Sequence, residues 1–206
     1  MMGIEDFYYK IKKVKINIFS PLTLVILLCN ESVYSLLLII LSIAIHETGH
    51  LLAIFILNVK IENIKIEPFG CSIAIDRYTK YKNEIIISLS GPILGMVVSI
   101  LCYFLLNSYS SVYLFYFMIL NFSYSIINLI PCKGLDGGML ISSIISLIFE
   151  PNRSYIITEL IFKMSSSLML LLMIYVCFRV GFNLSLTSLC IFILIVFPHN
   201  NKKTDI

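Results

Sequence analysis

The sequence predicts an all-α polytopic membrane protein with about six transmembrane helices and a small β-hairpin inserted between the second and third helices. The first observation is composition: 59% of the 206 residues are hydrophobic and only 13% are charged, with a mean hydropathy of +0.95. Soluble domains carry about 25% charged residues. The second observation is that long apolar runs recur along the chain, and a soluble protein of this size has too little interior to bury them.

Six apolar runs are interpreted as membrane segments. The second is the clearest, because a helix of its length would span about 37 Å and so cross a hydrocarbon core of about 30 Å. The first is short and contains Pro21, so we expect it to tilt or to thin the bilayer locally. The runs comprise residues 16–29, 33–57, 85–106, 112–130, 164–178 and 183–198.

The distribution of Lys and Arg predicts the topology. Short translocated loops tend to exclude positive charge, whereas cytoplasmic loops retain it. With the six segments above, fourteen of the fifteen basic residues fall on one side and only Arg179 falls on the other. This pattern predicts a multi-pass protein with both termini in the cytoplasm and the lipid bilayer as a partner. The net charge of +3 is too weak to indicate a nucleic-acid partner.

The chain is expected to form a single domain over residues 1–206. The six cysteines are scattered singly and form no C-x-x-C pair, so they indicate neither a redox motif nor a cysteine metal cluster. The tail after Phe197 is short, so we expect no second, soluble domain.

The loop at residues 58–84 differs in its residue pattern from the apolar runs. Apolar and polar residues alternate on both sides of Pro68-Phe69-Gly70, a pattern typical of a β-hairpin. One interpretation is a hairpin that caps the membrane surface. The other is a sheet edge that receives an extended substrate strand, in which Gly70, Ile73 and Ile75 would contact or support the substrate.

The strongest local signal is His46-Glu47-Thr48-Gly49-His50, near the end of the second segment. Residues four apart share one face of a helix, so both imidazoles can reach one metal ion while Glu47 addresses a bound water. Apolar residues flank the motif on both sides, and ionisable groups at such depth usually mark function. The alternative is that the two histidines are neutral, hydrogen-bonded interior residues and that Glu47 is paired or protonated.

Zinc in a hydrolytic site takes three protein ligands and leaves a fourth position open, so two histidines are one ligand short. Asp136 is the better candidate for the third, since His199 lies in the polar tail. Pro131 disfavours helix before it, and the nearby glycines permit turns, so the fourth helix should break here. Non-helical backbone at membrane depth is tolerated only where it is buried in protein or lines a water-filled cavity. The alternative is a surface turn with a solvated Asp136.

Together, His46-Glu47-Thr48-Gly49-His50, Asn128-Leu-Ile-Pro131 and Leu135-Asp136-Gly137-Gly138 closely resemble the motifs of the site-2 protease family, peptidase family M50. The members of this family are intramembrane zinc metalloproteases. The six-segment layout resembles the bacterial sporulation branch, typified by stage IV sporulation protein FB. Ser90-Gly91-Pro92 also resembles a turn of the family, which often continues to an Asn where this chain has Gly95.

The resemblance implies one Zn²⁺ per chain, held by His46, His50 and Asp136, with Glu47 as the catalytic base. It also implies a location in the bacterial cell membrane and cleavage of a protein substrate near the cytoplasmic face. For the sporulation branch, the substrate would be a pro-sigma factor and membrane regulatory proteins would be partners. The sequence lacks the C-terminal CBS domain common in that branch, so ATP-linked control is not implied.

Supporting roles are expected for three further residues of the second motif. Asn128 could orient the broken segment, bind the substrate or simply end its helix. Pro131 and Gly137 would shape the break. The alternative functions are cleavage of a membrane-anchored anti-sigma factor or of a signal-peptide remnant, a non-catalytic zinc-binding adaptor, and a metal transporter. Intact Glu47 argues against the adaptor, and a transporter would need polar residues along a full crossing.

Overall fold

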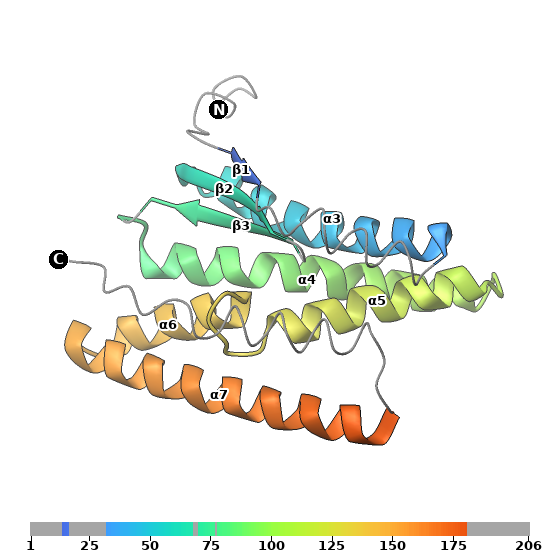
Figure 1. The fold of residues 1–206 in the computed structure, drawn as a ribbon. Coiled ribbons are helices and arrows are strands. Elements are labelled where there is room, and N and C mark those ends of the chain that lie inside the picture. The colour runs from blue at the N-terminus through green and yellow to red at the C-terminus, as the bar shows by residue number, and fades with distance from the viewer. Residues whose placement is uncertain (1–13, 17–31, 68–69, 77, 181–206) are drawn as a thin grey trace. The chain divides into compact units, whose positions relative to one another are not determined.

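The computed structural model describes residues 14–16, 32–67, 70–76 and 78–180 (Figure 1). The chain divides into two compact units, residues 1–129 and 130–206. Most of the first predicted membrane segment and all of the last, at residues 17–29 and 183–198, lie outside the described residues. The described elements, in chain order, are β1 (Val14–Ile16), α3 (Val33–Ile56), β2 (Ile61–Glu67), β3 (Gly70–Ile75), α4 (Tyr81–Leu106), α5 (Val112–Asn128), α6 (Asp136–Ile148) and α7 (Pro151–Val180).

In the first unit, α3 and α5 match the predicted second and fourth segments to within two residues at each end. Each begins at a serine that caps the helix. The Oγ of Ser32 accepts a hydrogen bond from the amide of Ser35 at 3.1 Å, and the Oγ of Ser111 accepts one from the amide of Leu114 at 3.4 Å. Such caps satisfy amides that have no partner within the first turn of a helix.

Helix α4 begins at Tyr81, four residues before the predicted segment, and it continues through Pro92. The Ser90-Gly91-Pro92 stretch, which resembles a turn of the family, is therefore helical in this structure. Proline removes one main-chain donor from a helix, here the one that would serve the carbonyl of Ser88, but packing against neighbouring helices lets a membrane helix tolerate this loss.

Helices α3, α4 and α5 pack against one another. The contact between α3 and α4 is close because glycines meet there. A Cβ on Gly49 would lie 2.6 Å from the carbonyl oxygen of Ser90 and 2.9 Å from the Cα of Gly91. Small residues allow membrane helices to approach backbone to backbone, where van der Waals contact replaces the hydrophobic effect.

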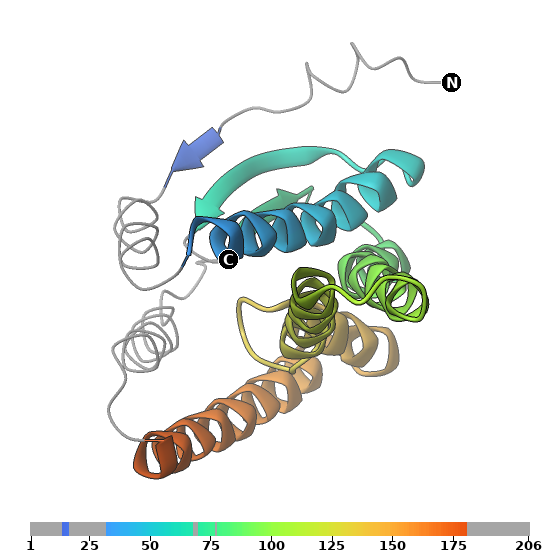
Figure 2. The same ribbon diagram turned by 90° about the vertical axis from the view of Figure 1, so that its right-hand side faces the viewer.

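The predicted hairpin is confirmed: β2 and β3 are antiparallel, with Ile64 opposite Ile73. It belongs to a three-stranded sheet of order β1-β2-β3, in which Val14 of β1 lies opposite Ile64 in parallel pairing. The sequence analysis missed β1 because three residues carry too little alternation to be recognised. Strand β3 contacts α3, and the sheet lies alongside that helix (Figures 1 and 2).

The second unit contains α6 and α7, which pack against each other. The hydroxyls of Ser146 and Ser154 are hydrogen-bonded at 2.8 Å, which links the two helices near their turn. Helix α6 was not predicted, since its 13 residues are too few to cross a bilayer and it opens on two glycines. Helix α7 begins at Pro151, well before the predicted start at residue 164, because proline is favoured in a first helical turn.

Among the described residues, three helices are long and apolar enough to cross a membrane, namely α3, α4 and α7. Helix α5 has 17 residues and α6 has 13, so both are shorter than a full crossing. Many large apolar side chains are exposed, among them Leu37 of α3, Phe104 of α4 and Leu171 of α7. These features indicate a membrane protein, and the count of six crossings stays a prediction.

Candidate metal centre

The two histidines of the first motif face each other inside the first unit. His46 and His50 lie one turn apart on α3, and only 2% and 6% of their surfaces are exposed. Their Nε2 atoms are 3.2 Å apart. Two nitrogens bound tetrahedrally to one zinc at the usual bond length of about 2.05 Å would be about 3.3 Å apart. The spacing therefore fits two ligands of a single zinc ion.

The ring of His50 is oriented by helix α4. Its Nδ1 lies 2.7 Å from the carbonyl oxygen of Ile87. Because a carbonyl can only accept, Nδ1 carries the proton and the lone pair is left on Nε2, the atom that faces His46. Hydrogen bonds of this kind fix the tautomer of metal-binding histidines and increase their basicity.

Gly91 of α4 provides the space for the His50 ring. A Cβ at Gly91 would lie 2.3 Å from Nε2 and 2.7 Å from Cε1 of His50. No side chain larger than hydrogen fits without moving the imidazole. In the sequence, Gly91 stands out only as part of Ser90-Gly91-Pro92, and no local pattern there predicts its contact with the ring.

His46 is held from the other side by α5. The ring of Tyr124 packs edge-on against it, with centroids 4.7 Å apart and an interplanar angle of 79°. Sequence analysis also missed Tyr124, although its position four residues before Asn128 places both on one face of α5. Glu47 is the next residue after His46 on α3 and is half-buried, so the acid lies beside the histidine pair in the sequence and on the same helix.

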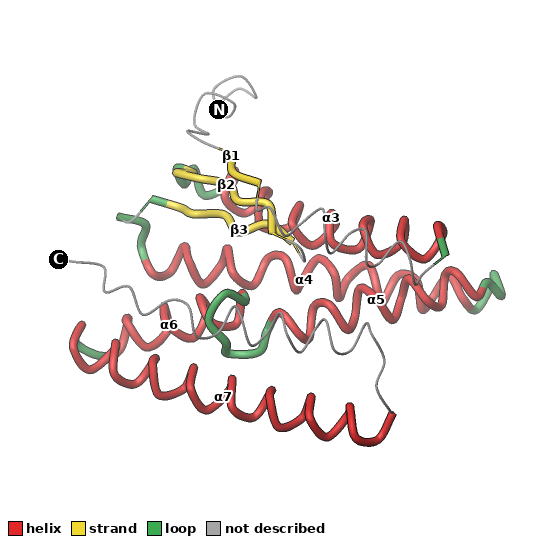
Figure 3. The backbone as a smooth tube through the Cα atoms, in the orientation of Figure 1, coloured by secondary structure: helices red, strands yellow, loops and turns green. Residues whose placement is uncertain are grey.

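Asp136 is the first residue of α6, in the second unit. The chain reaches it through a non-helical loop at residues 129–135 (Figure 3). The loop turns at Gly134, whose φ of +91° favours glycine, and the amide of Gly138 donates to the carbonyl of Leu135 at 3.0 Å. The predicted break near Pro131 is therefore confirmed. A carboxylate in a first turn is stabilised by the helix dipole.

The loop and the start of α6 are closely packed at Gly138. A Cβ there would lie only 2.1 Å from the carbonyl oxygen of Cys132, a backbone atom that cannot turn aside. We therefore expect Gly138→Ala to lower the melting temperature by several degrees and to weaken metal binding, as judged by thermal unfolding and metal titration. Serine or alanine at the exposed Lys133 of the same loop is the control, and a Gly138→Ala protein as stable as the wild type would contradict this packing.

All three supporting residues lie at the end of α5, in the following loop or at the start of α6. The amide of Asn128 donates from Nδ2 to the carbonyl of Tyr124 at 3.0 Å, and α5 ends at Asn128. This bond favours the helix-ending role over substrate binding. Gly137 is buried in the first turn of α6, and Pro131 lies in the loop before it.

Within the described ranges, His46 and His50 are two candidate metal ligands in the first unit, and Asp136 is a candidate carboxylate ligand in the second. Two imidazole nitrogens and one carboxylate are a donor set used by catalytic zinc, which keeps a fourth position for water or substrate.

Comparison with known proteins bears on this group. The model of peptidase family M50 matches residues 34–112 and 107–172, more than half of the chain. The chain belongs to peptidase family M50. The family match includes His46, Glu47, His50 and Asp136, so the resemblance found in the sequence is confirmed at the level of the family.

Two relatives illustrate the likeness. A zinc metalloprotease of Methanocaldococcus jannaschii is 28% identical over 171 residues, which are 79% of this chain and 49% of that protein. The chain thus spans about half the length of the curated relative. The solved structure of a site-2 protease from the same organism aligns with a TM-score of 0.69 and 22% identity, over 94% of this chain and 92% of the other. This M50 protein therefore has the site-2 protease fold.

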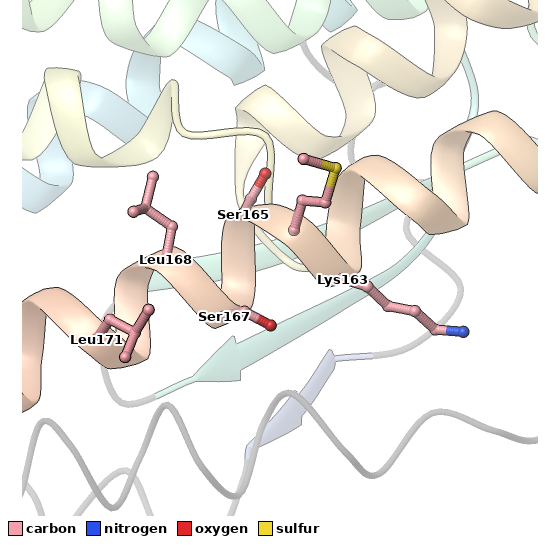
Figure 4. A pocket seen from close by; sticks show the side chains of 6 residues that line it. Lys163, Ser165, Ser167, Leu168 and Leu171 are labelled. Atoms are coloured by element: carbon pink, nitrogen blue, oxygen red, sulfur yellow. The ribbon is translucent and has the colours of Figure 1, made fainter.

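A shallow hollow of about 560 Å³ runs along α7 and is lined by residues of that helix alone (Figure 4). It offers no histidine, cysteine or carboxylate, so it has no ligand set for a zinc ion. Its lining residues are Lys163, Met164, Ser165, Ser167, Leu168 and Leu171.

Proposed function

We propose that this M50 protein is a zinc-dependent intramembrane endopeptidase. The observation that carries the proposal is the pair of buried imidazoles whose Nε2 atoms face each other at 3.2 Å, with a glutamate beside them on α3. Two neutral histidines and an acid in an apolar helix are costly unless they bind something. A metal ion used to hydrolyse a peptide bond explains all three.

Asp136 is proposed as the third protein ligand. Its support comes from donor chemistry: a carboxylate completes a neutral pair of imidazoles to the three-ligand set of hydrolytic zinc. The loop before α6 presents Asp136 at the start of a helix rather than in its interior. Asp136→Asn should therefore lower zinc affinity while leaving the fold of both units intact.

A bound zinc ion supplies Lewis acidity, which lowers the pKa of water to about 7 and polarises a carbonyl group. The residues of the chain would complete the reaction. Glu47 would take a proton from the attacking water as the new C–O bond forms, and would give that proton to the leaving nitrogen as the C–N bond breaks. The hydrogen bond from His50 to Ile87 would keep the imidazole in one tautomer throughout.

The proposed substrate is a membrane-associated protein cleaved near the cytoplasmic face of a bacterial membrane, specifically a pro-sigma factor. Support comes from the likeness of the motifs and layout to the sporulation branch. Co-expression of the wild type or the Glu47→Gln variant with candidate substrates tests this. A size shift of the pro-sigma factor in the wild type alone is expected. A shift of an anti-sigma factor or a signal-peptide remnant instead would overturn the proposed substrate but not the enzyme.

Strand β3 is proposed to hold the substrate in an extended form. Peptide bonds inside a helix are shielded, and adding a strand to a sheet edge would expose them. Among the described residues, β3 pairs only with β2. The amide of Asp76 donates to the carbonyl of Lys60 at 3.0 Å, so by alternation the amides of Ile75 and Ile73 point away from β2.

Proline at position 73 should therefore remove an outer-edge donor without breaking the hairpin. We expect Ile73→Pro to slow substrate cleavage about tenfold while zinc content and expression stay unchanged, measured by cleavage in co-expressing cells and by metal analysis. Ile73→Val keeps both the amide and the branched side chain, and serves as the matched control. Full activity of the proline variant would count against strand addition.

A further inference from the structure

Asn121 is a polar side chain in the middle of α5, and it is only 1% exposed. Its Nδ2 donates to the Oγ of Ser42 on α3 at 3.1 Å and to the carbonyl of Phe117 at 2.9 Å. The hydroxyl of Ser42 donates to the carbonyl of Leu38 at 2.9 Å, so it can only accept from Asn121. Two acceptors thus fix the orientation of the amide, and both of its N–H donors are used.

The Oδ1 of Asn121 has no hydrogen-bond partner among the described residues. An acceptor left buried and unsatisfied destabilises the folded protein, so we expect a donor for Oδ1. The nearby hydroxyls are committed: Ser125 donates to the carbonyl of Asn121 at 2.8 Å, and Ser99 donates to that of Met118 at 3.0 Å. Gly95 of α4 has no side chain to offer. Among the described residues these hydroxyls leave no donor for Oδ1, so we infer that a buried water molecule supplies it.

The contacts of α5 place Asn121 close to the candidate metal centre. Asn121 bonds Ser42, four residues before His46 on α3, while Tyr124, three residues after Asn121, packs on His46 itself. The two helices therefore run in matching register, and His46 lies one helical turn, about 5.4 Å along α3, from the residue that Asn121 contacts. A water molecule whose two hydrogen bonds are each about 2.8 Å long joins polar atoms about 4.5 Å apart.

The histidine pair defines what such a water would do. An imidazole that binds a metal through Nε2 carries its proton on Nδ1 and donates it to an oxygen, which fixes the ring. For His50 that oxygen is the carbonyl of Ile87. We propose that Asn121 is the corresponding positioning residue for His46: its Oδ1 accepts a hydrogen bond from one buried water, which accepts the Nδ1–H of His46. This inference rests on the proposed zinc site.

The test separates positioning from stability with the double variant Ser42→Ala/Asn121→Leu. Replacing both partners of a buried hydrogen bond by apolar groups is nearly neutral for stability, so the metal-free variant should unfold within a few degrees of the wild type, as followed by circular dichroism. Zinc affinity, measured by competition with a chelator, should fall about 10- to 100-fold.

Ser99→Ala is the matched control, because it removes a hydrogen bond between α4 and α5 that does not lead to His46. It should lower the melting temperature and leave zinc affinity unchanged. Wild-type zinc affinity in the double variant would overturn the role of Asn121. A loss of affinity that follows the melting temperature in both variants would overturn it too. Absence of zinc from the wild type would contradict the proposed function itself. A wild type that binds zinc, together with an unchanged affinity in the double variant, would contradict only the role of Asn121.

Discussion

The Glu47→Gln protein is expected to keep one zinc ion per chain and to cleave its substrate about 10²- to 10⁴-fold more slowly than the wild type, the usual contribution of a general base. Glutamine has nearly the same shape as glutamate but cannot accept the proton of the attacking water. The His46 and His50 side chains keep their packing against α4 and α5 in this variant. Metal analysis of the purified protein and cleavage in co-expressing cells measure the two effects.

Glu150→Gln is the control for this substitution, because it makes the same chemical change at an exposed position between α6 and α7. It should match the wild type in zinc content and in cleavage. Cleavage at the wild-type rate by Glu47→Gln would end the assignment of Glu47 as the base. Loss of zinc from that variant would instead make Glu47 a metal ligand.

Gly91→Ala is expected to weaken zinc binding about 10- to 100-fold. This is the usual loss when a metal-binding side chain loses the hydrogen bond that orients it. The new methyl group would lie 2.3 Å from the Nε2 of His50, the very atom that faces His46. Either the ring turns away or α3 and α4 move apart. In both cases the hydrogen bond from His50 to the carbonyl of Ile87 is strained. Zinc titration into metal-free protein measures the loss.

A second glycine on α4 provides the matched control. A methyl group at Gly95 would meet only the hydroxyl of Ser125, at 2.2 Å, and ordinary contacts beyond it. The double variant Gly95→Ala/Ser125→Ala should therefore fold and bind zinc as the wild type does. Equal losses in this variant and in Gly91→Ala would mean that glycine in α4, rather than space for His50, determines the affinity.

The sequence predicted those elements that a strong local pattern of residues specifies. The apolar run at 33–57 became α3, and the alternation around Gly70 became β2 and β3. The spacing of His46 and His50 brought their rings to one face, since four residues make about one helical turn. The motif that contains Pro131 correctly located the break after α5.

The parts that the sequence missed depend on contacts between elements. The parallel partner of β2 is only three residues long, and α6 has too few residues to be recognised as a membrane segment. The support of the histidine rings by Ile87, Gly91 and Tyr124 comes from two other helices. The spacing of residues within α3 cannot predict these contacts with other helices. The continuation of α4 through Pro92 depends on the packing of that helix against its neighbours, which the sequence pattern does not reveal.

We claim that one zinc ion is bound by His46, His50 and Asp136. X-ray absorption at the zinc edge of the purified protein tests it most directly, because the spectrum distinguishes imidazole, oxygen and sulfur ligands. We expect one zinc per chain with two imidazoles and oxygen donors at about 2.0 to 2.1 Å, and loss of one oxygen or of the metal in Asp136→Ala. A sulfur ligand, a single imidazole, or an unchanged spectrum in Asp136→Ala would contradict the claim.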